Sequence, residues 1–243
     1  MIRAAGRVRQ RYRSVPLLRM GVWCTFVNHE SAEGPVSKTT TTTRRGAPKR
    51  GEPSARERLV ETAIELFYQH GIRAIGIDAV LERSGVSKSS LYRTFASKDE
   101  LIAAFADEQN RRFWAWWDAI VAAHPGAPRR QIDALFDAIA GLIASPGFRG
   151  CPFVNLATEF PDRDHPGTVI ACANKAEVRH RLHALCRALV VDDPVRLGNQ
   201  LSLLMEGAYA SAMTFGVADL KGELADGARR LIDSAIQASP DER

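Results

Sequence analysis

The sequence of 243 residues lacks the marks of several large classes of protein. It holds no run of about 18 to 20 apolar residues, the length that a helix needs to cross a bilayer, so we expect no membrane partner. Its four cysteines form no Cys-x-x-Cys pair, which argues against a disulfide framework and against a zinc site. These absences predict a cytoplasmic protein with reduced thiols.

The motifs of common enzyme classes are missing as well. There is no Walker phosphate loop, no Gly-x-Gly-x-x-Gly after a strand pattern, no Gly-x-Ser-x-Gly and no His-Glu-x-x-His. Glu159, Asp162 and His165 are close enough in sequence for acid–base chemistry. They fall at a predicted helix end and loop, however, where polar residues are expected anyway. We therefore expect neither an enzyme nor a bound cofactor.

Charge is present in quantity but unevenly distributed, around a net charge of +5. Residues 1–58 hold thirteen Lys and Arg and four acidic residues, a net +9, and the remainder holds 20 basic and 24 acidic residues, a net −4. A basic arm on a mildly acidic body points to a polyanion, most often nucleic acid. The composition of the arm fits a disordered, soluble leader equally well.

Residues 1–52 are predicted to form this disordered basic leader. Residues 1–35 show no helical period and no secretory core, and their Arg-rich composition also resembles a transit peptide. Val36 opens a Thr-rich run that leads into the folded region. Our hypothesis is that Val36 is the true start, read as Met, and that residues 1–35 are not translated. Peptides spanning Arg13 to Glu33 in the native protein would contradict it.

A helix is predicted to begin directly after the leader. Ser54 is placed to cap it, and Glu57, three residues on, completes a capping box. Gly71 is placed to end it. Apolar residues recur between them at helical spacing, at Leu59, Ala63, Leu66 and Phe67.

Two short helices are predicted next, one over residues 77–83 and one that Ser87 caps. The turn between them contains Gly85, which adopts positive φ without steric cost. Leu91 and Phe95, four residues apart, form the buried face of the second short helix. A helix, a three-residue turn with Gly and a helix form a helix-turn-helix, whose second helix lies in the DNA major groove.

The outward side chains of this second helix suit contact with DNA. Ser89 and Ser90 are short and allow close approach, while Lys88 and Tyr92 are candidates for phosphate contacts. Arg93 is the candidate for reading a base, by a bidentate contact to guanine. The same side chains also fit solvated positions on a short helix.

Residues 56–103 resemble the N-terminal DNA-binding domain of the TetR family of bacterial transcriptional regulators. The matching features are Leu66-Phe67 followed by Gly71, the turn from Ser84 to Ser87, Leu91-Tyr92 followed by Phe95, and Ser97-Lys98 followed by Leu101. The resemblance implies a DNA-binding domain over residues 53–103, with phosphate contacts by Tyr92 and Lys98. Ser97 would cap the helix that Lys98 opens, and a helix N-terminus favours an anion.

Two positions depart from the family pattern. Thr94 stands where many members have His, which alters a predicted phosphate contact. Gly76-Ile77 stands where many members begin a helix with Thr or Ser, which leaves the cap of that helix open. Upstream of the domain, Arg44 and Arg45 are expected to add phosphate or minor-groove contacts.

The rest of the chain, residues 104–243, is predicted to be a helical effector-binding and dimerisation domain, so that the whole protein is all-α. Proline and glycine clusters separate its segments. The predicted helices are residues 101–123, 131–144, 153–160, 167–190, 194–215 and 219–238.

The resemblance implies a homodimer held by the last two helices of each subunit. A stripe on the penultimate helix supplies the predicted interface, with small residues that allow close approach. Packing inside one chain explains the stripe equally well. The predicted interface residues are Leu201, Leu204, Met205, Ala208 and Ala212.

The resemblance also implies an internal cavity for a small apolar effector. Aromatic side chains at helical spacing are the candidates for its lining, although such side chains more often form core. The predicted pocket residues are Trp114, Trp117, Phe136, Cys151, Phe153 and Phe160.

Cys151 raises a second possibility, because it lies near a predicted helix N-terminus and beside Arg149, which both lower a thiol pKa. It is a conceivable sensor of electrophiles or oxidants, or else a buried, inert thiol. A third pattern places Glu177, His180, His183 and Cys186 at steps of three. Each step of three drifts by about 60° around a helix, so the four do not converge, and no metal site is expected.

The sequence therefore predicts a DNA-binding transcriptional regulator. The expected protein is a homodimeric repressor that leaves double-stranded operator DNA when a small-molecule effector binds. The alternatives are a redox- or electrophile-sensing regulator that uses Cys151 and, less favoured, an enzyme or a nonspecific architectural DNA-binding protein. An architectural protein would not need the turn motif, and its body should not be acidic.

Overall fold

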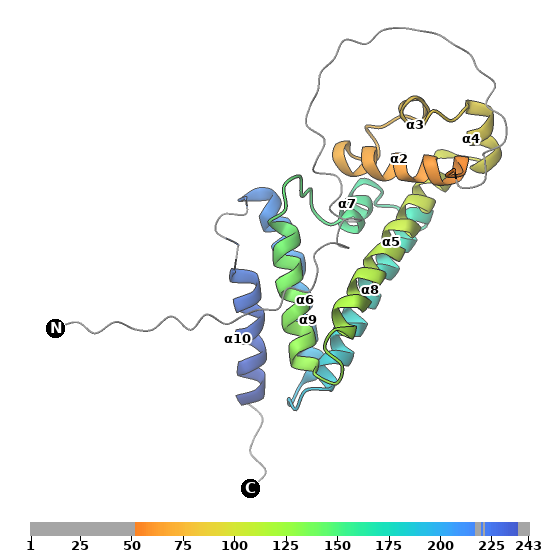
Figure 1. The fold of residues 1–243 in the computed structure, drawn as a ribbon. Coiled ribbons are helices and arrows are strands. Elements are labelled where there is room, and N and C mark those ends of the chain that lie inside the picture. Colours follow the sequence, from red (N-terminus) through yellow and green to blue (C-terminus); the bar gives the residue numbers. More distant parts are fainter. Residues whose placement is uncertain (1–51, 217–219, 221, 238–243) are drawn as a thin grey trace.

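The computed structural model describes residues 52–216, 220 and 222–237, and every regular element in these ranges is an α-helix (Figure 1). This confirms the predicted all-α fold class. The predictions for the leader, including Arg44, Arg45 and the start at Val36, lie outside the described residues. No described helix is both long enough and apolar enough to span a membrane.

Three N-terminal helices lie together at one end of the molecule: α2 (Ala55–His70), α3 (Ile77–Ser84) and α4 (Lys88–Thr94) (Figure 1). The predicted capping box opens α2, since the Ser54 hydroxyl accepts from the Glu57 N–H while the Glu57 carboxylate accepts from the Ser54 N–H. Two orphan donors of the first turn are thereby satisfied.

The turn between α3 and α4 has the predicted geometry. Gly85 has φ of 64°, in the left-handed region, and its N–H donates to the Leu81 carbonyl. The Ser87 hydroxyl then caps α4 by accepting from the Ser90 N–H. Leu91 and Phe95 are buried and pack α4 against the neighbouring helices. At the start of α3, Gly76 supplies no side-chain cap.

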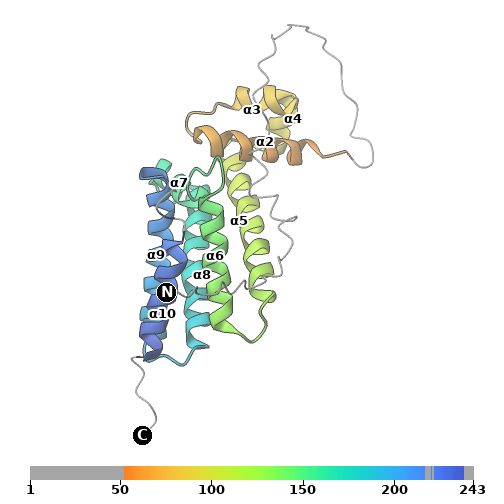
Figure 2. The same cartoon turned by 60° about the vertical axis from the view of Figure 1, so that its left-hand side comes forward.

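The long helix α5 (Lys98–Ala122) connects these helices to the rest of the molecule. It packs against α2 at its start and then runs beside α8 (Pro166–Arg187) (Figures 1 and 2). Ser97 caps it as predicted, by accepting from the Glu100 N–H. The helix passes without a break through residues 103 and 104, where the sequence suggested a domain boundary.

Four further helices complete the bundle: α6 (Pro128–Ile143), α7 (Pro152–Glu159), α9 (Pro194–Thr214) and α10 (Glu223–Gln237). α8 packs against α5, α7 and α9, and α10 packs against α6 and α9 (Figure 2). The starts of α6, α7 and α8 lie one to three residues before those predicted. Proline occupies the first turn of each, where its missing N–H costs nothing.

One continuous set of buried side chains runs from α2 through the bundle to α10. The N-terminal helices therefore share a hydrophobic core with the bundle and are not connected to it by a linker alone. The short helix α7 lies directly beneath α2, between the two ends of this core (Figure 1).

Candidate DNA-binding surface and regulatory sites

The outer face of α4 is open to solvent. Lys88, Ser89, Tyr92 and Arg93 are exposed, whereas Leu91, on the opposite side, is 0% exposed. The Tyr92 side chain is 51% exposed although it is aromatic. A short helix with one buried anchor and four exposed polar or aromatic side chains is the arrangement that the sequence predicted for a recognition helix.

Hydrogen bonds within α4 hold several of these side chains. The Arg93 guanidinium donates to the Ser90 hydroxyl over 3.3 Å, and the Thr94 hydroxyl donates to the Ser90 carbonyl over 2.7 Å. The Lys88 ammonium lies 3.5 Å from the exposed Asp78 carboxylate, a surface pair of little strength. Lys88 and Arg93 therefore have weak, exposed partners that DNA could replace.

Lys98 is placed differently from the other predicted contacts. Its ammonium donates to the Ile72 carbonyl over 2.8 Å and lies 5.9 Å from the centre of the Phe67 ring. Burial lowers its pKa, an effect that the neighbouring Glu159 and Asp99 carboxylates oppose. In this conformation the ammonium supports the turn after α2, and its predicted phosphate contact stays a prediction.

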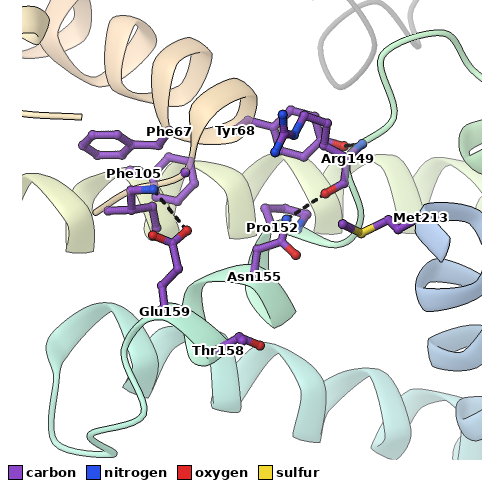
Figure 3. A pocket seen from close by; sticks show the side chains of 11 residues that line it. Phe67, Tyr68, Phe105, Arg149, Pro152, Asn155, Thr158, Glu159 and Met213 are labelled. Atoms are coloured by element: carbon purple, nitrogen blue, oxygen red, sulfur yellow. Dashed lines mark hydrogen bonds between the residues drawn. The ribbon is translucent and has the colours of Figure 1, made fainter. Parts of the chain in front are cut away.

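The turn after α2 is also held by α7. The Glu159 carboxylate, at the end of α7, accepts from the Ile72 N–H over 3.1 Å (Figure 3) and from the Arg73 N–H over 2.7 Å. Gly71, with φ of 89°, brings these two N–H groups toward the carboxylate. Hydrogen bonds to an ionised acceptor are among the stronger ones in proteins.

A second contact joins α2 to the segment before α7. The Tyr68 hydroxyl accepts from the Arg149 N–H over 2.9 Å and donates to the Gly150 carbonyl over 3.2 Å. α7 is therefore tied to α2 just before its first residue and at its last residue. We call this pair of contacts, made by Tyr68 and Glu159, the α7 bracket.

A cavity of about 230 Å³ lies between the two ends of the α7 bracket (Figure 3). Its walls are partly aromatic and partly polar, and Arg149 and Glu159 lie on different sides of it (Figure 3). None of the six predicted pocket residues lines it. The lining residues are Phe67, Tyr68, Gly71, Ile72, Phe105, Arg149, Pro152, Asn155, Thr158, Glu159 and Met213.

Comparisons with known proteins agree with this architecture. The family model described as bacterial regulatory proteins, tetR family, matches residues 59–105, which run from α2 into α5. The solved TetR-family transcriptional regulator SCO4454 of Streptomyces coelicolor is 32% identical, over 75% of this chain and 96% of that chain, with a TM-score of 0.71. The chain belongs to the TetR family.

Two further relatives of this TetR-family chain are informative. A tetR-type regulator of Streptomyces avermitilis (sav143) is 34% identical over 75% of this chain and 98% of that chain, with a TM-score of 0.66. The transcriptional repressor ComR of Escherichia coli is 26% identical over 173 residues, 67% of this chain and 82% of ComR. The chain is thus a DNA-binding regulator of transcription, in a family of regulators rather than enzymes.

Part of the predicted effector pocket of this TetR-family regulator forms one aromatic cluster. Trp114, Trp117 and Phe153 each pack against Phe113, with ring centres 4.8 to 6.1 Å apart. Trp117 and Phe153 are each 2% exposed, so they belong to the core of the bundle. Phe136 is equally buried, on α6.

Phe160 lies apart from this cluster, at the junction with α2. Its ring stacks on His165 at 4.3 Å between centres, and the Arg73 guanidinium lies 5.2 Å from its centre. It thus packs beside the turn that Glu159 holds. The structure therefore separates Phe160 from the other predicted pocket residues.

Cys151 precedes α7 and lies beside a half-buried ion pair that the sequence did not indicate. The thiol is 4% exposed, and Arg149 is exposed to solvent. The nearby cation is instead Lys175, whose ammonium donates to the Glu206 carboxylate over 2.7 Å. Burial lowers the pKa of Lys175, but Cys151 and Glu206 raise it by more, so it lies above the ordinary value and the ammonium stays charged.

The residues at steps of three on α8 contact neighbouring side chains or are buried. His183 pairs with Asn199 over 2.9 Å, and Glu177 binds Arg181 and lies 3.5 Å from His180. Burial raises the pKa of the Cys186 thiol to about 11. Within the described residues, no group of three or more His, Cys, Asp or Glu is placed to hold a metal ion.

The predicted dimer stripe on α9 faces the inside of the chain. Leu201 is 0% exposed and Met205 is 1% exposed, while Leu204 lies against Gly227 of α10. Ala208 and Ala212 are also buried. Side chains without exposed surface cannot be buried further by a partner, so Leu201 and Met205 belong to the core, the alternative that the sequence left open, whereas Leu204 is only half-buried and its place in an interface stays a prediction. The opposite face of α9 is exposed and includes Leu203, at 73%.

Sequence reasoning missed the residues that connect separate parts of the chain. The sequence indicated for Glu159 an acid–base role, which was set aside, or a polar position at a helix end, and Tyr68 and Lys175 belong to no motif. Their partners lie far away in sequence: 82 residues separate Tyr68 from Gly150, and 87 separate Ile72 from Glu159. Only pairing information between distant positions could have indicated them.

Proposed function

We propose that this regulator is a homodimeric repressor that leaves its operator when a small-molecule effector binds. The observation that carries the proposal is the exposed face of α4, displayed at one end of a helical bundle. The relation to ComR, a transcriptional repressor, supports repression rather than activation. The proposed division is a DNA-binding domain over residues 53–103 and an effector and dimerisation domain over residues 104–243, in a cytoplasmic protein.

In this proposal α4 enters the major groove of double-stranded operator DNA. Arg93 reads a base, Lys88 and Tyr92 contact phosphates, and the short side chains of Ser89 and Ser90 allow close approach. Thr94 and Lys98 add phosphate contacts once their internal hydrogen bonds are exchanged. Arg44 and Arg45 add contacts from the leader. These lie outside the described residues.

The proposed dimer uses the exposed face of α9 together with α10. Leu203 is 73% exposed, Met213 53% and Val195 43% on α9, and Ile236 on α10 is 41% exposed. Gly207, on the same side as Leu203, has open space around it, which would admit a closely packed helix. Exposed apolar side chains on adjacent helices are typical of an interface between subunits.

The proposed effector binds among the aromatic side chains of α5, α6 and α7. Because Trp117, Phe136 and Phe153 are packed in the core, binding requires these helices to separate. α7 then moves, and through the α7 bracket it moves the DNA-binding helices. The ligand would thus change the separation of the two recognition helices in the dimer.

Footprinting on the DNA that flanks the gene of this protein tests the proposal. We expect a protected, approximately palindromic site whose half-sites lie one or more helical turns apart, and loss of protection with one of a panel of small molecules. Protection of unrelated DNA without sequence preference would contradict a specific operator. A single protected half-site would contradict the dimer.

A second candidate is a repressor that responds to electrophiles through Cys151. The Lys175 ammonium beside the thiol favours it, because cysteines that react with electrophiles lie in electropositive surroundings. Burial of the thiol limits access and weighs against it. If an electrophile releases operator DNA from wild type and equally from Cys151→Ser, this candidate is wrong.

A further inference from the structure

Besides the buried core that they share with the bundle, the DNA-binding helices have two further connections to it. The first is covalent: α4 leads through residues 95–97 into α5. The second is the α7 bracket, which holds the C-terminal end of α2 and the turn after it. Its two contacts lie at opposite ends of α7, so they resist both translation and rotation of α2 against the bundle.

The Glu159 end of the bracket is the more specific of the two. One carboxylate receives two consecutive backbone N–H groups, at 3.1 and 2.7 Å, and this fixes both its position and its plane. The same turn is also held by Lys98, whose ammonium donates to the Ile72 carbonyl. Ile72 itself is 2% exposed, so the turn has a buried side chain as well.

We propose that Glu159 determines the half-site spacing that the regulator accepts, although it contacts no DNA. The proposal rests on the homodimer proposed above. In a dimer, the orientation of α2 against the bundle sets the distance and the angle between the two α4 helices. One base pair changes the position of a half-site by about 3.4 Å and about 35° around the duplex, so a rigid bracket admits one spacing.

A general effect of charge has to be separated from this geometric effect. Glu159 lies near Arg73 and Lys98, and removing its charge makes the surface more positive, which strengthens binding to all DNA. Asp162, three residues on and exposed, offers a matched control, since Asp162→Asn removes the same charge without touching the turn after α2. Among the residues that the structure describes, its carboxylate accepts from the Asp164 N–H.

The experiment compares wild type, Glu159→Gln and Asp162→Asn on operator duplexes whose half-site separation is varied in single base pairs. Fluorescence anisotropy gives the dissociation constants. We expect wild type and Asp162→Asn to prefer one separation by about tenfold or more over its neighbours, and Glu159→Gln by less than about threefold. The ranking of half-site sequences should stay the same in all three proteins.

Each other result overturns the proposal. Equal spacing preference in wild type and Glu159→Gln shows that the bracket does not set the separation, and the same relaxation in Asp162→Asn shows an effect of charge. If wild type has no spacing preference, the dimer proposal fails, and this one fails with it. Hydrogen exchange of the Ile72 and Arg73 amides should be faster in Glu159→Gln.

Tyr68→Phe keeps the proposal testable if Glu159→Gln does not fold. It removes the hydroxyl that bridges Arg149 and Gly150 and leaves the ring in place. We expect it to relax the spacing preference in the same direction, without changing the ranking of half-site sequences. A Tyr68→Phe protein that folds and keeps the full wild-type preference would contradict the proposed role of the bracket.

Discussion

Two neighbouring leucines on α9 provide a sharp test of which face of this helix meets a partner. Leu201 is 0% exposed and Leu203 is 73% exposed, and the two are otherwise the same residue on the same helix. Leu201→Ala removes three buried carbons, worth about 2.5 kcal/mol of transfer free energy. With the cavity that remains, we expect a loss of about 3 to 4 kcal/mol in the free energy of unfolding.

Leu203→Ala should have the opposite profile. Truncating this exposed side chain should change the free energy of unfolding of a single chain by less than about 0.5 kcal/mol. If a partner covers the side chain in both subunits, the dimer loses about 2 to 4 kcal/mol, which raises its dissociation constant about 30- to 700-fold.

Urea unfolding and sedimentation velocity over a dilution series measure the two effects separately. Unfolding is followed at two protein concentrations, because the stability of a dimer depends on concentration. A folded, monomeric Leu201→Ala protein beside a fully dimeric Leu203→Ala protein would refute the reasoning, since it would place the buried stripe at the interface.

The remaining predictions concern DNA, pH and the thiol. Arg93→Ala should lose about 1 to 3 kcal/mol of discrimination at one operator position in a mutated-operator binding series, and an unchanged ranking would disprove base reading by this residue. Lys98→Ala should weaken binding to all sequences and lower the slope of log affinity against log salt by about one. An unchanged slope would show that Lys98 contacts no phosphate and only donates to the Ile72 carbonyl. Hydrogen bonds from Arg111 lower the pKa of Glu108 to about 2. Because this pKa lies below the ordinary 4.5, the carboxylate stabilises the fold above about pH 4.5 and loses that effect as the pH falls toward 2. The urea concentration at the unfolding midpoint should therefore depend less on pH over this range in Glu108→Gln than in wild type. Cys151→Ser should leave operator binding unchanged and abolish release only by reagents that modify the thiol, as gel-shift assays with an electrophile would reveal.

The N-terminal helices were predictable because their signals are local. The capping box of Ser54 and Glu57 and the left-handed Gly85 act within four residues, and each has one dominant physical explanation. The starts of α6 and α7 were misplaced by one to three residues because proline was interpreted as a break, although it is favoured in the first turn.

The parts that could not be predicted depend on contacts between distant segments. α9 carries apolar residues on two faces, and spacing alone does not decide which of them meets the bundle and which meets solvent. The cation beside Cys151 came from α8 rather than from neighbouring Arg149, and the partners of Glu159 lie on the turn after α2. A single sequence does not record such pairings.

The α7 bracket also bears on how DNA-binding modules can be exchanged between regulators of this fold. α2, α3 and α4 share a core with the bundle, and α2 and the turn after it donate hydrogen bonds to the Gly150 carbonyl and to the Glu159 carboxylate of α7, so the three helices are not an independent module. A chimera that replaces only residues 53–97 would bring a foreign turn against Glu159. Transfer of operator preference by grafting would therefore require that α7 and residues 149 and 150 travel with the recognition helix.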